Sequence, residues 1–193
     1  MGLFDERIAY KPFEYPEYYT EGWLKQAQAF WLHTEIPMQS DVKDWKEKLN
    51  DKEKNLVGNI LLGFAQTECA VSDYWTQKVV SWFPKHEIQQ MAMMFGSQET
   101  IHAVAYSYLN ETLGLENFEA FLHEPTTAAR FDNLVSYSGT DPIGIAKSLA
   151  VFCSHQADDP ALCGHGLRIP CPHFFRHLRR QRQFPWPHNR SRF

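Results

Sequence analysis

The chain of 193 residues lacks a long apolar run, a leader-like start and any convincing strand pattern before residue 152. No stretch approaches the roughly 18–20 consecutive apolar residues that a membrane-spanning helix needs. The opening residues, MGLFDERIAY, carry acidic side chains where a secretory signal would have basic and then apolar ones. We therefore expect a soluble, cytoplasmic protein with no membrane partner.

Cysteine is scarce, and its distribution argues against a disulfide framework. Only Cys69 of the four cysteines lies in a strongly periodic segment, and the other three are Cys153, Cys163 and Cys171. Glutamate is absent from the chain after Glu124. The C-terminal part of the sequence therefore offers no glutamate to any site that would need one.

Charge is distributed unevenly along the chain. Residues 1–152 hold 12 Lys and Arg against 21 Asp and Glu, whereas residues 153–193 hold 7 Arg and 2 Asp. This change predicts a helical domain over 1–152 and an Arg/Pro/His/Cys-rich tail over 153–193. For the tail we favour disorder or out-of-frame translation. A zinc segment built on its repeated C-x-H pairs and a nucleic-acid arm are the weaker alternatives. We expect no nucleic-acid partner.

Apolar residues at helical spacing predict an all-α fold. The predicted helices cover residues 18–33, 40–49, 50–83, 85–114, 116–122, 127–139 and 141–152. The expected N-caps are Ser40 or Asp41 for the second helix, Asn50 or Asp51 for the third and Asp141 for the last. The helix over 85–114 is expected to end at a glycine cap, Gly114.

The two longest predicted helices meet at Pro84 and should pack antiparallel as a helical hairpin. Each carries one acid in the middle of its apolar stripe, and Glu68 lies 16 residues before Pro84 whereas Glu99 lies 15 after it. The hairpin therefore brings the two carboxylates level with each other, facing the same core. A buried carboxylate without a partner is costly, so both acids need compensation.

The stretch GSQETIHAVAYSYL, residues 96–109, places Glu99, His102 and Tyr106 on one helix face. An acid and an imidazole one turn apart, with a level acid on the next helix, are typical of carboxylate metal sites in helical bundles. Glu68, Glu99 and His102 are therefore the candidate metal ligands. Tyr106 is either a core residue with a bonded hydroxyl or a redox-active residue beside the metal.

Together these motifs resemble the small, radical-generating (R2) subunit of class I ribonucleotide reductase over about residues 15–152. FGSQETIHAVAYSYL is similar to the family's helix that carries its first Glu-x-x-His pair and its radical tyrosine, which corresponds to Tyr106. AFWLHTEIPMQSDVKDWKEKLNDKEKNLVGNIL is similar to the family's entry segment, and Trp31 stands where the family has its electron-relay tryptophan. FAQTECAVSDYW is similar to the helix with the first carboxylate, which is Asp in many members and Glu68 here.

The resemblance implies a ferritin-like helical bundle and an oxidoreductase that supplies deoxyribonucleotides for DNA replication. It implies a di-iron centre that uses O₂ to form a tyrosyl radical on Tyr106, and an electron relay through Trp31 to the large subunit of ribonucleoside-diphosphate reductase. A homodimer is expected for the family. Relatives with Glu at the first carboxylate position differ in their metals, so iron is implied and a manganese/iron pair stays open.

The second half of the family's ligand set, another Glu and a second Glu-x-x-His, has no counterpart in this sequence. We therefore expect a bundle that is incomplete on its C-terminal side and a truncated chain that is inactive alone. The alternatives are an R2-like or other ferritin-like di-iron oxidase, a non-enzymatic iron-binding protein and a helical domain whose Glu-x-x-His is structural. Trp31 and Tyr106 favour the reductase subunit among these.

Overall fold

The computed structural model describes residues 2–6, 9–115, 117–136, 139 and 141–157. Within these ranges the regular structure is entirely helical, which confirms the predicted all-α class. In chain order the elements are η1 (Tyr18–Trp23), α1 (Leu24–Gln28), η2 (His33–Glu35), α2 (Gln39–Glu47), α3 (Asp51–Asp73), η3 (Tyr74–Val79), α4 (Val80–Trp82), α5 (His86–Leu113), α6 (Phe118–Leu122), α7 (Pro125–Ser136) and α8 (Pro142–Ala157). The part of the predicted tail from residue 158 onward lies outside the described residues.

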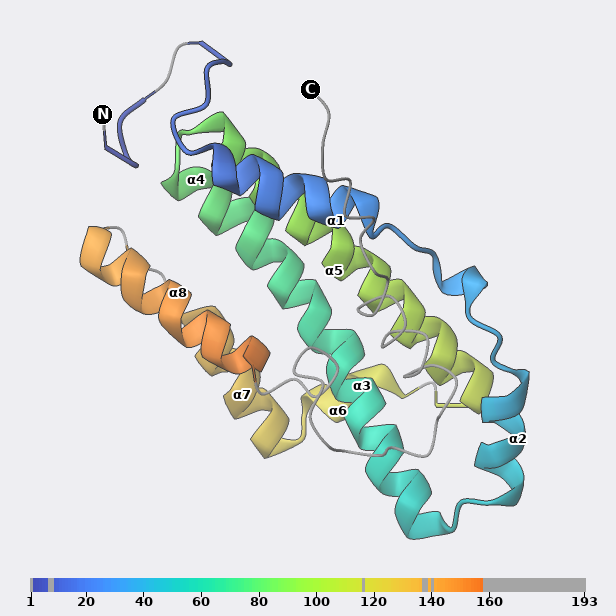
Figure 1. The fold of residues 1–193 in the computed structure, drawn as a ribbon. Coiled ribbons are helices and arrows are strands. Elements are labelled where there is room, and N and C mark those ends of the chain that lie inside the picture. Colours follow the sequence, from blue (N-terminus) through green and yellow to red (C-terminus); the bar gives the residue numbers. More distant parts are fainter. Residues whose placement is uncertain (1, 7–8, 116, 137–138, 140, 158–193) are drawn as a thin grey trace.

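The centre of the fold is the predicted antiparallel hairpin. α3, the π-helical segment η3 and α4 follow one another without a break, and α5 runs back beside them after Pro84 (Figure 1). Asn50 caps α3 as predicted: its Oδ1 accepts the N–H groups of Lys52 and Glu53 at 3.0 and 3.1 Å, and Glu53 accepts the N–H of Asn50 at 2.9 Å. Gly114 ends α5 at a φ of 76°, which confirms the predicted glycine cap.

The first predicted helix is too long. Helical structure ends at Gln28 rather than near residue 33, and residues 29–32 leave the helix before the short turn of η2. In this stretch Trp31 is buried whereas Phe30 and Leu32 are 57% and 45% exposed. Burying Trp31 in the core while both neighbours face solvent favours an extended backbone over a helix, because alternate side chains of an extended chain point to opposite sides.

The predicted cap of the second helix is also wrong. Met38 occupies the N-cap position of α2, so Ser40 and Asp41 lie inside its first turn. By contrast Asp141 caps α8 as predicted, since its Oδ1 accepts the N–H groups of Ile143 and Gly144. α8 continues past residue 152, where the composition changes.

Two apolar clusters fill the interior. The Trp31 cluster consists of the buried residues Trp31, Ile36, Met38, Trp45, Leu49, Val57, Leu61, Phe64, Ala65, Ala105, Tyr106, Leu109 and Leu113. The Trp75 cluster consists of Val71, Tyr74, Trp75, Val79, Phe83, Ile88, Ala92, Ile145 and Phe152. α8 closes the second cluster, where the ring of Phe152 stacks on Tyr74 with 3.9 Å between centroids. Along α3, Glu68 lies between the residues of the two clusters.

Buried polar contacts tie the N-terminal segment to the start of α5. Glu87 accepts the N–H groups of Glu14 and Tyr15, each at 2.9 Å, and the Lys85 ammonium donates to the Glu14 carboxylate at 3.1 Å. Lys85 and Glu87 are fully buried. These contacts place η1 and α1 along α5 (Figure 1), ahead of the stretch that carries Trp31. Among the described residues, no helix combines the length and the apolar character that crossing a bilayer requires.

Replacing Asn50 by Ala removes the acceptor that caps α3. We expect Asn50→Ala to lower the free energy of unfolding by about 1 kcal/mol, because two N–H groups at the helix start lose their partner. Urea unfolding followed by circular dichroism measures this. Asn59→Ala, at an exposed position of the same helix, is the control and should change the value by less than about 0.5 kcal/mol. Equal effects of the two substitutions would contradict the capping role.

Candidate metal centre

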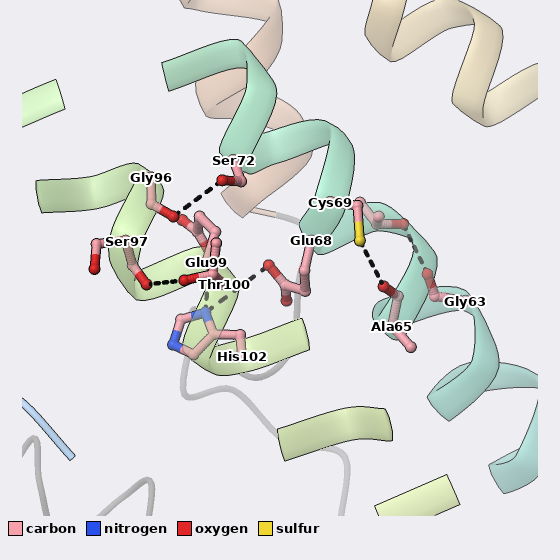
Figure 2. Close-up of polar contacts among 11 residues, drawn as sticks. Gly63, Ala65, Glu68, Cys69, Ser72, Gly96, Ser97, Glu99, Thr100 and His102 are labelled. Carbon is pink, nitrogen blue, oxygen red and sulfur yellow. Dashed lines mark hydrogen bonds and ion pairs between the residues drawn. The ribbon is translucent and has the colours of Figure 1, made fainter. Parts of the chain in front are cut away.

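The structure brings Glu68 of α3 together with Glu99 and His102 of α5. Each offers one potential ligand atom, and these three atoms lie within 4.8 Å of one another. Nδ1 of His102 lies 2.9 Å from a carboxylate oxygen of Glu99 and 3.8 Å from one of Glu68 (Figure 2). The three residues meet at one level of the hairpin. This is the position predicted from the distances of Glu68 and Glu99 to Pro84 and from the spacing of Glu99 and His102 along α5.

Both acids are buried at the point where the two apolar clusters adjoin. Glu68 is 7% and Glu99 8% exposed, whereas the side chain of His102 is about a quarter exposed. Phe64 and Ala65 lie on one side of Glu68 along α3, and Val71 lies on the other. Two carboxylates in such surroundings require a positive charge or a proton, because an isolated ionised carboxylate is poorly solvated there.

Without a metal, protons supply this compensation. Burial raises the pKa of Glu68 to about 8, and the negative charge of Glu99 adds to the effect although the nearby imidazole of His102 opposes it. Burial disfavours the charged imidazolium of His102. The nearby carboxylate of Glu68 and the hydrogen-bonded carboxylate of Glu99 nevertheless outweigh burial and raise the pKa of His102 to about 10. At neutral pH the metal-free group therefore carries a neutral Glu68 and a protonated His102.

The donor set fits one divalent transition-metal ion. Two carboxylate oxygens and one imidazole nitrogen are ligands that iron, manganese, cobalt and zinc accept. A cation also replaces the proton that burial imposes on Glu68 and the proton that the two carboxylates hold on His102. Within the described ranges, this is the single group of three or more acidic, His or Cys residues close enough to share an ion. The described donors thus suffice for one ion and are too few for the pair that the R2 resemblance implies.

Trp31 and Tyr106 lie on the side of the site that faces the Trp31 cluster. The rings of Trp31 and His102 are 6.1 Å apart between centroids and inclined by 34°. Tyr106, one turn beyond His102 on α5, is 3% exposed, and its ring lies 5.3 Å from that of Phe64. All five residues expected from the sequence to take part in the site are thus gathered around one stretch of the hairpin.

The sequence reading missed a contact next to the ligands. Ser72, one turn after Glu68, donates its hydroxyl hydrogen bond to the carbonyl oxygen of Gly96, one turn before Glu99 (Figure 2). A signal for it exists in the sequence, since a glycine inside a long helical stretch indicates a close approach of another segment. Which segment approaches Gly96 could not be read from that signal alone.

Comparisons with known proteins agree with this arrangement. The family model described as "Ribonucleotide reductase, small chain" matches residues 7–156. A probable ribonucleoside-diphosphate reductase small subunit of Invertebrate iridescent virus 6 is 40% identical over 115 residues, which cover 60% of this chain and 32% of that protein. The corresponding protein of Invertebrate iridescent virus 3 is 32% identical over 169 residues, or 78% of this chain and 44% of that protein.

A more distant relative is the ribonucleoside-diphosphate reductase small subunit of Dictyostelium discoideum, 28% identical over 110 residues, which cover 55% of this chain and 31% of that protein. The matched region therefore spans only 31–44% of the length of these relatives. The family match covers most of the present sequence, including every residue of the candidate metal centre. This protein belongs to the ribonucleotide reductase small-chain family.

Proposed function

We propose that the protein acts as a small subunit of ribonucleoside-diphosphate reductase and contributes the first half of its iron site. The observation that carries this proposal is the convergence of two buried carboxylates and an imidazole, Glu68, Glu99 and His102, within 4.8 Å. Completed by further ligands, this site would hold a di-iron centre whose reaction with O₂ would oxidise Tyr106 to a tyrosyl radical. The large subunit uses that radical to make deoxyribonucleotides. The same three donors suit manganese as well as iron, so a complete centre with a manganese/iron pair is the alternative.

The three ligands hold the metal and set its charge balance. Glu68 and His102 release their protons when a cation binds, and the carboxylates of Glu68 and Glu99 then neutralise its charge. Iron in this position supplies the electrons needed to activate O₂. The apolar surroundings of Glu68 and Glu99 keep bulk water away from the ligand oxygens.

Tyr106 and Trp31 are the residues that we assign to electron transfer. Tyr106 is buried one turn from His102, so a radical on its ring is shielded from solvent. Trp31 lies beside the His102 ring, and its sequence neighbours Phe30 and Leu32 reach the surface. This arrangement supports a relay from the metal centre to a partner on that side, a role that an iron-storage protein would not need.

We also propose the homodimer that is usual in the family, and a cytoplasmic location. Met93, Val104 and Tyr108 lie on one face of α5 and are 50%, 49% and 41% exposed, with the exposed Ser97 and Thr100 between Met93 and Val104. A second copy of the protein would cover this partly apolar face. The large subunit would approach from the side of Trp31. The two contacts would adjoin, because the ring of Tyr108 lies 5.2 Å from that of His33, two residues after Trp31.

Metal binding tests the ligand assignment directly. We expect the purified protein to bind about one Fe²⁺ under anaerobic conditions, because three donors suit a single ion. Glu68→Gln, Glu99→Gln and His102→Gln should each weaken binding by roughly 100-fold or more, since losing a residue that only supports a ligand already costs about 10–100-fold. Titration with metal analysis measures both. Glu111→Gln, an exposed acid of the same helix, is the control. Unchanged binding in the three ligand variants would refute the site.

Metal affinity should rise with pH. Glu68 has a pKa of about 8 and His102 of about 10, so below these values the ion must displace protons. We expect the apparent association constant to increase roughly tenfold or more per pH unit between pH 6 and 8, since at least one proton leaves per ion. Calorimetry in buffers of different ionisation enthalpy counts the protons released. An affinity that is flat over this range would contradict the protonated resting state.

Radical formation tests whether the protein is active alone. We expect no stable tyrosyl radical when it is loaded with Fe²⁺ and exposed to O₂. The described residues supply one set of three ligands, and the sequence has no glutamate after Glu124. Electron paramagnetic resonance detects the radical. A tyrosyl signal that disappears in Tyr106→Phe would show instead that one copy of the protein, or a pair of copies, completes the centre.

A further inference from the structure

The two helices of the hairpin approach each other closely at Gly96. A Cβ atom placed on Gly96 would lie 2.4 Å from Cγ2 of Thr76 and 3.3 Å from the carbonyl oxygen of Ser72. The first distance is well below van der Waals contact, so an alanine here requires the two helices or the threonine to move. Gly96 therefore permits a separation between α5 and the end of α3 that no other residue would allow without rearrangement.

One hydrogen bond crosses this approach, and a second one, within the same helical stretch, orients Thr76. The Ser72 hydroxyl donates across the hairpin to the Gly96 carbonyl oxygen at 3.0 Å. The Thr76 hydroxyl donates to the carbonyl oxygen of Ser72 at 2.8 Å, which fixes the threonine rotamer. In that rotamer the Thr76 methyl group lies against the position where Gly96 lacks a side chain. Thr76 belongs to the π-helical segment η3, a type of helix distortion that is frequent beside functional sites.

This contact lies directly beside the metal ligands. Ser72 follows Glu68 by one turn of α3, and Gly96 precedes Glu99 by one turn of α5 (Figure 2). On the other side of the ligands the hairpin is held by Asn110, which donates to the carbonyl oxygen of Leu61 at 3.3 Å, about two turns from Glu68. The contact between Gly96 and Ser72 is therefore the closer of the two to the ligands along both helices.

We propose that Gly96, Ser72 and Thr76 are positioning residues of the metal centre, because they set the distance between the helices that carry Glu68 and Glu99. Metal–oxygen and metal–nitrogen bonds have lengths of roughly 2.0–2.2 Å, and productive sites tolerate displacements of about 0.5 Å. Separating the helices until the 2.4 Å contact reaches an ordinary 3.4 Å exceeds that tolerance, and the bond from the Thr76 hydroxyl to the Ser72 carbonyl oxygen opposes the alternative of turning the threonine. The proposal rests on the metal site proposed above and adds the contact that fixes Glu68 of α3 relative to Glu99 and His102 of α5.

The decisive experiment compares Co²⁺ affinity and the visible spectrum of bound Co²⁺ in four proteins. We expect Gly96→Ala to weaken Co²⁺ binding roughly tenfold or more and to alter the spectrum, as the loss of a supporting contact does at other metal sites. The double variant Gly96→Ala/Thr76→Ser deletes the methyl group that an alanine would meet and keeps the hydroxyl. The double variant should bind Co²⁺ with an affinity within about threefold of that of the unaltered protein, a smaller loss than in Gly96→Ala alone. Gly58→Ala is the matched control, since its Cβ would meet Leu115 at an ordinary 3.4 Å.

The outcomes separate this inference from the proposed function. No Co²⁺ binding by the unaltered protein would remove the metal site and the inference together. Full affinity and an unchanged spectrum in Gly96→Ala, or no recovery in the double variant, would overturn the inference alone. If Gly96→Ala does not fold, as judged by circular dichroism of the metal-free protein, Ser72→Ala decides. This substitution adds no atoms, and unchanged Co²⁺ affinity in it overturns the positioning role.

Discussion

Two carboxylates and an imidazole lie where α3 and α5 bury their apolar faces against each other, and this burial constrains the surrounding structure. The clusters around Trp31 and Trp75 stabilise the hairpin on either side of the ligands, while the ligands themselves oppose burial unless protons or a cation balance them. A hairpin held at both ends by apolar packing can keep such a group in its middle. The stabilising apolar packing and the candidate metal site therefore occupy different positions along the same two helices.

Much of the fold follows from local patterns. The break at Pro84, the cap at Asn50 and the end at Gly114 are determined by residues close in sequence, so the hairpin could be predicted. The early end of α1 could not be predicted in this way. It depends on Trp31 reaching a core formed by residues far along the sequence, and this tertiary contact overrides a helical pattern. The π-helical segment η3 likewise leaves no clear sequence signal.

The candidate site likewise has one part that the sequence predicts and another that it does not. Periodicity along each helix and the symmetric distances from Pro84 suffice to bring Glu68, Glu99 and His102 to one level. The depth at which the two helices meet is set by Gly96 and Ser72, and it depends on side-chain contacts across the hairpin. A periodic pattern tells which face of a helix is buried, but it does not give the distance to the helix opposite.

The contacts of the N-terminal segment have a consequence for the order of assembly. Ser72 and Gly96 are 24 residues apart in the sequence, whereas Glu14 and Glu87, which tie the N-terminal segment to α5, are 73 apart. Closing the shorter loop costs less conformational entropy, and Glu87, which accepts the N–H groups of Glu14 and Tyr15, lies on α5. A polypeptide emerging from the ribosome therefore produces its N-terminal segment first and docks it late. The hairpin that carries Glu68, Glu99 and His102 forms beforehand, and Trp31 then packs against it.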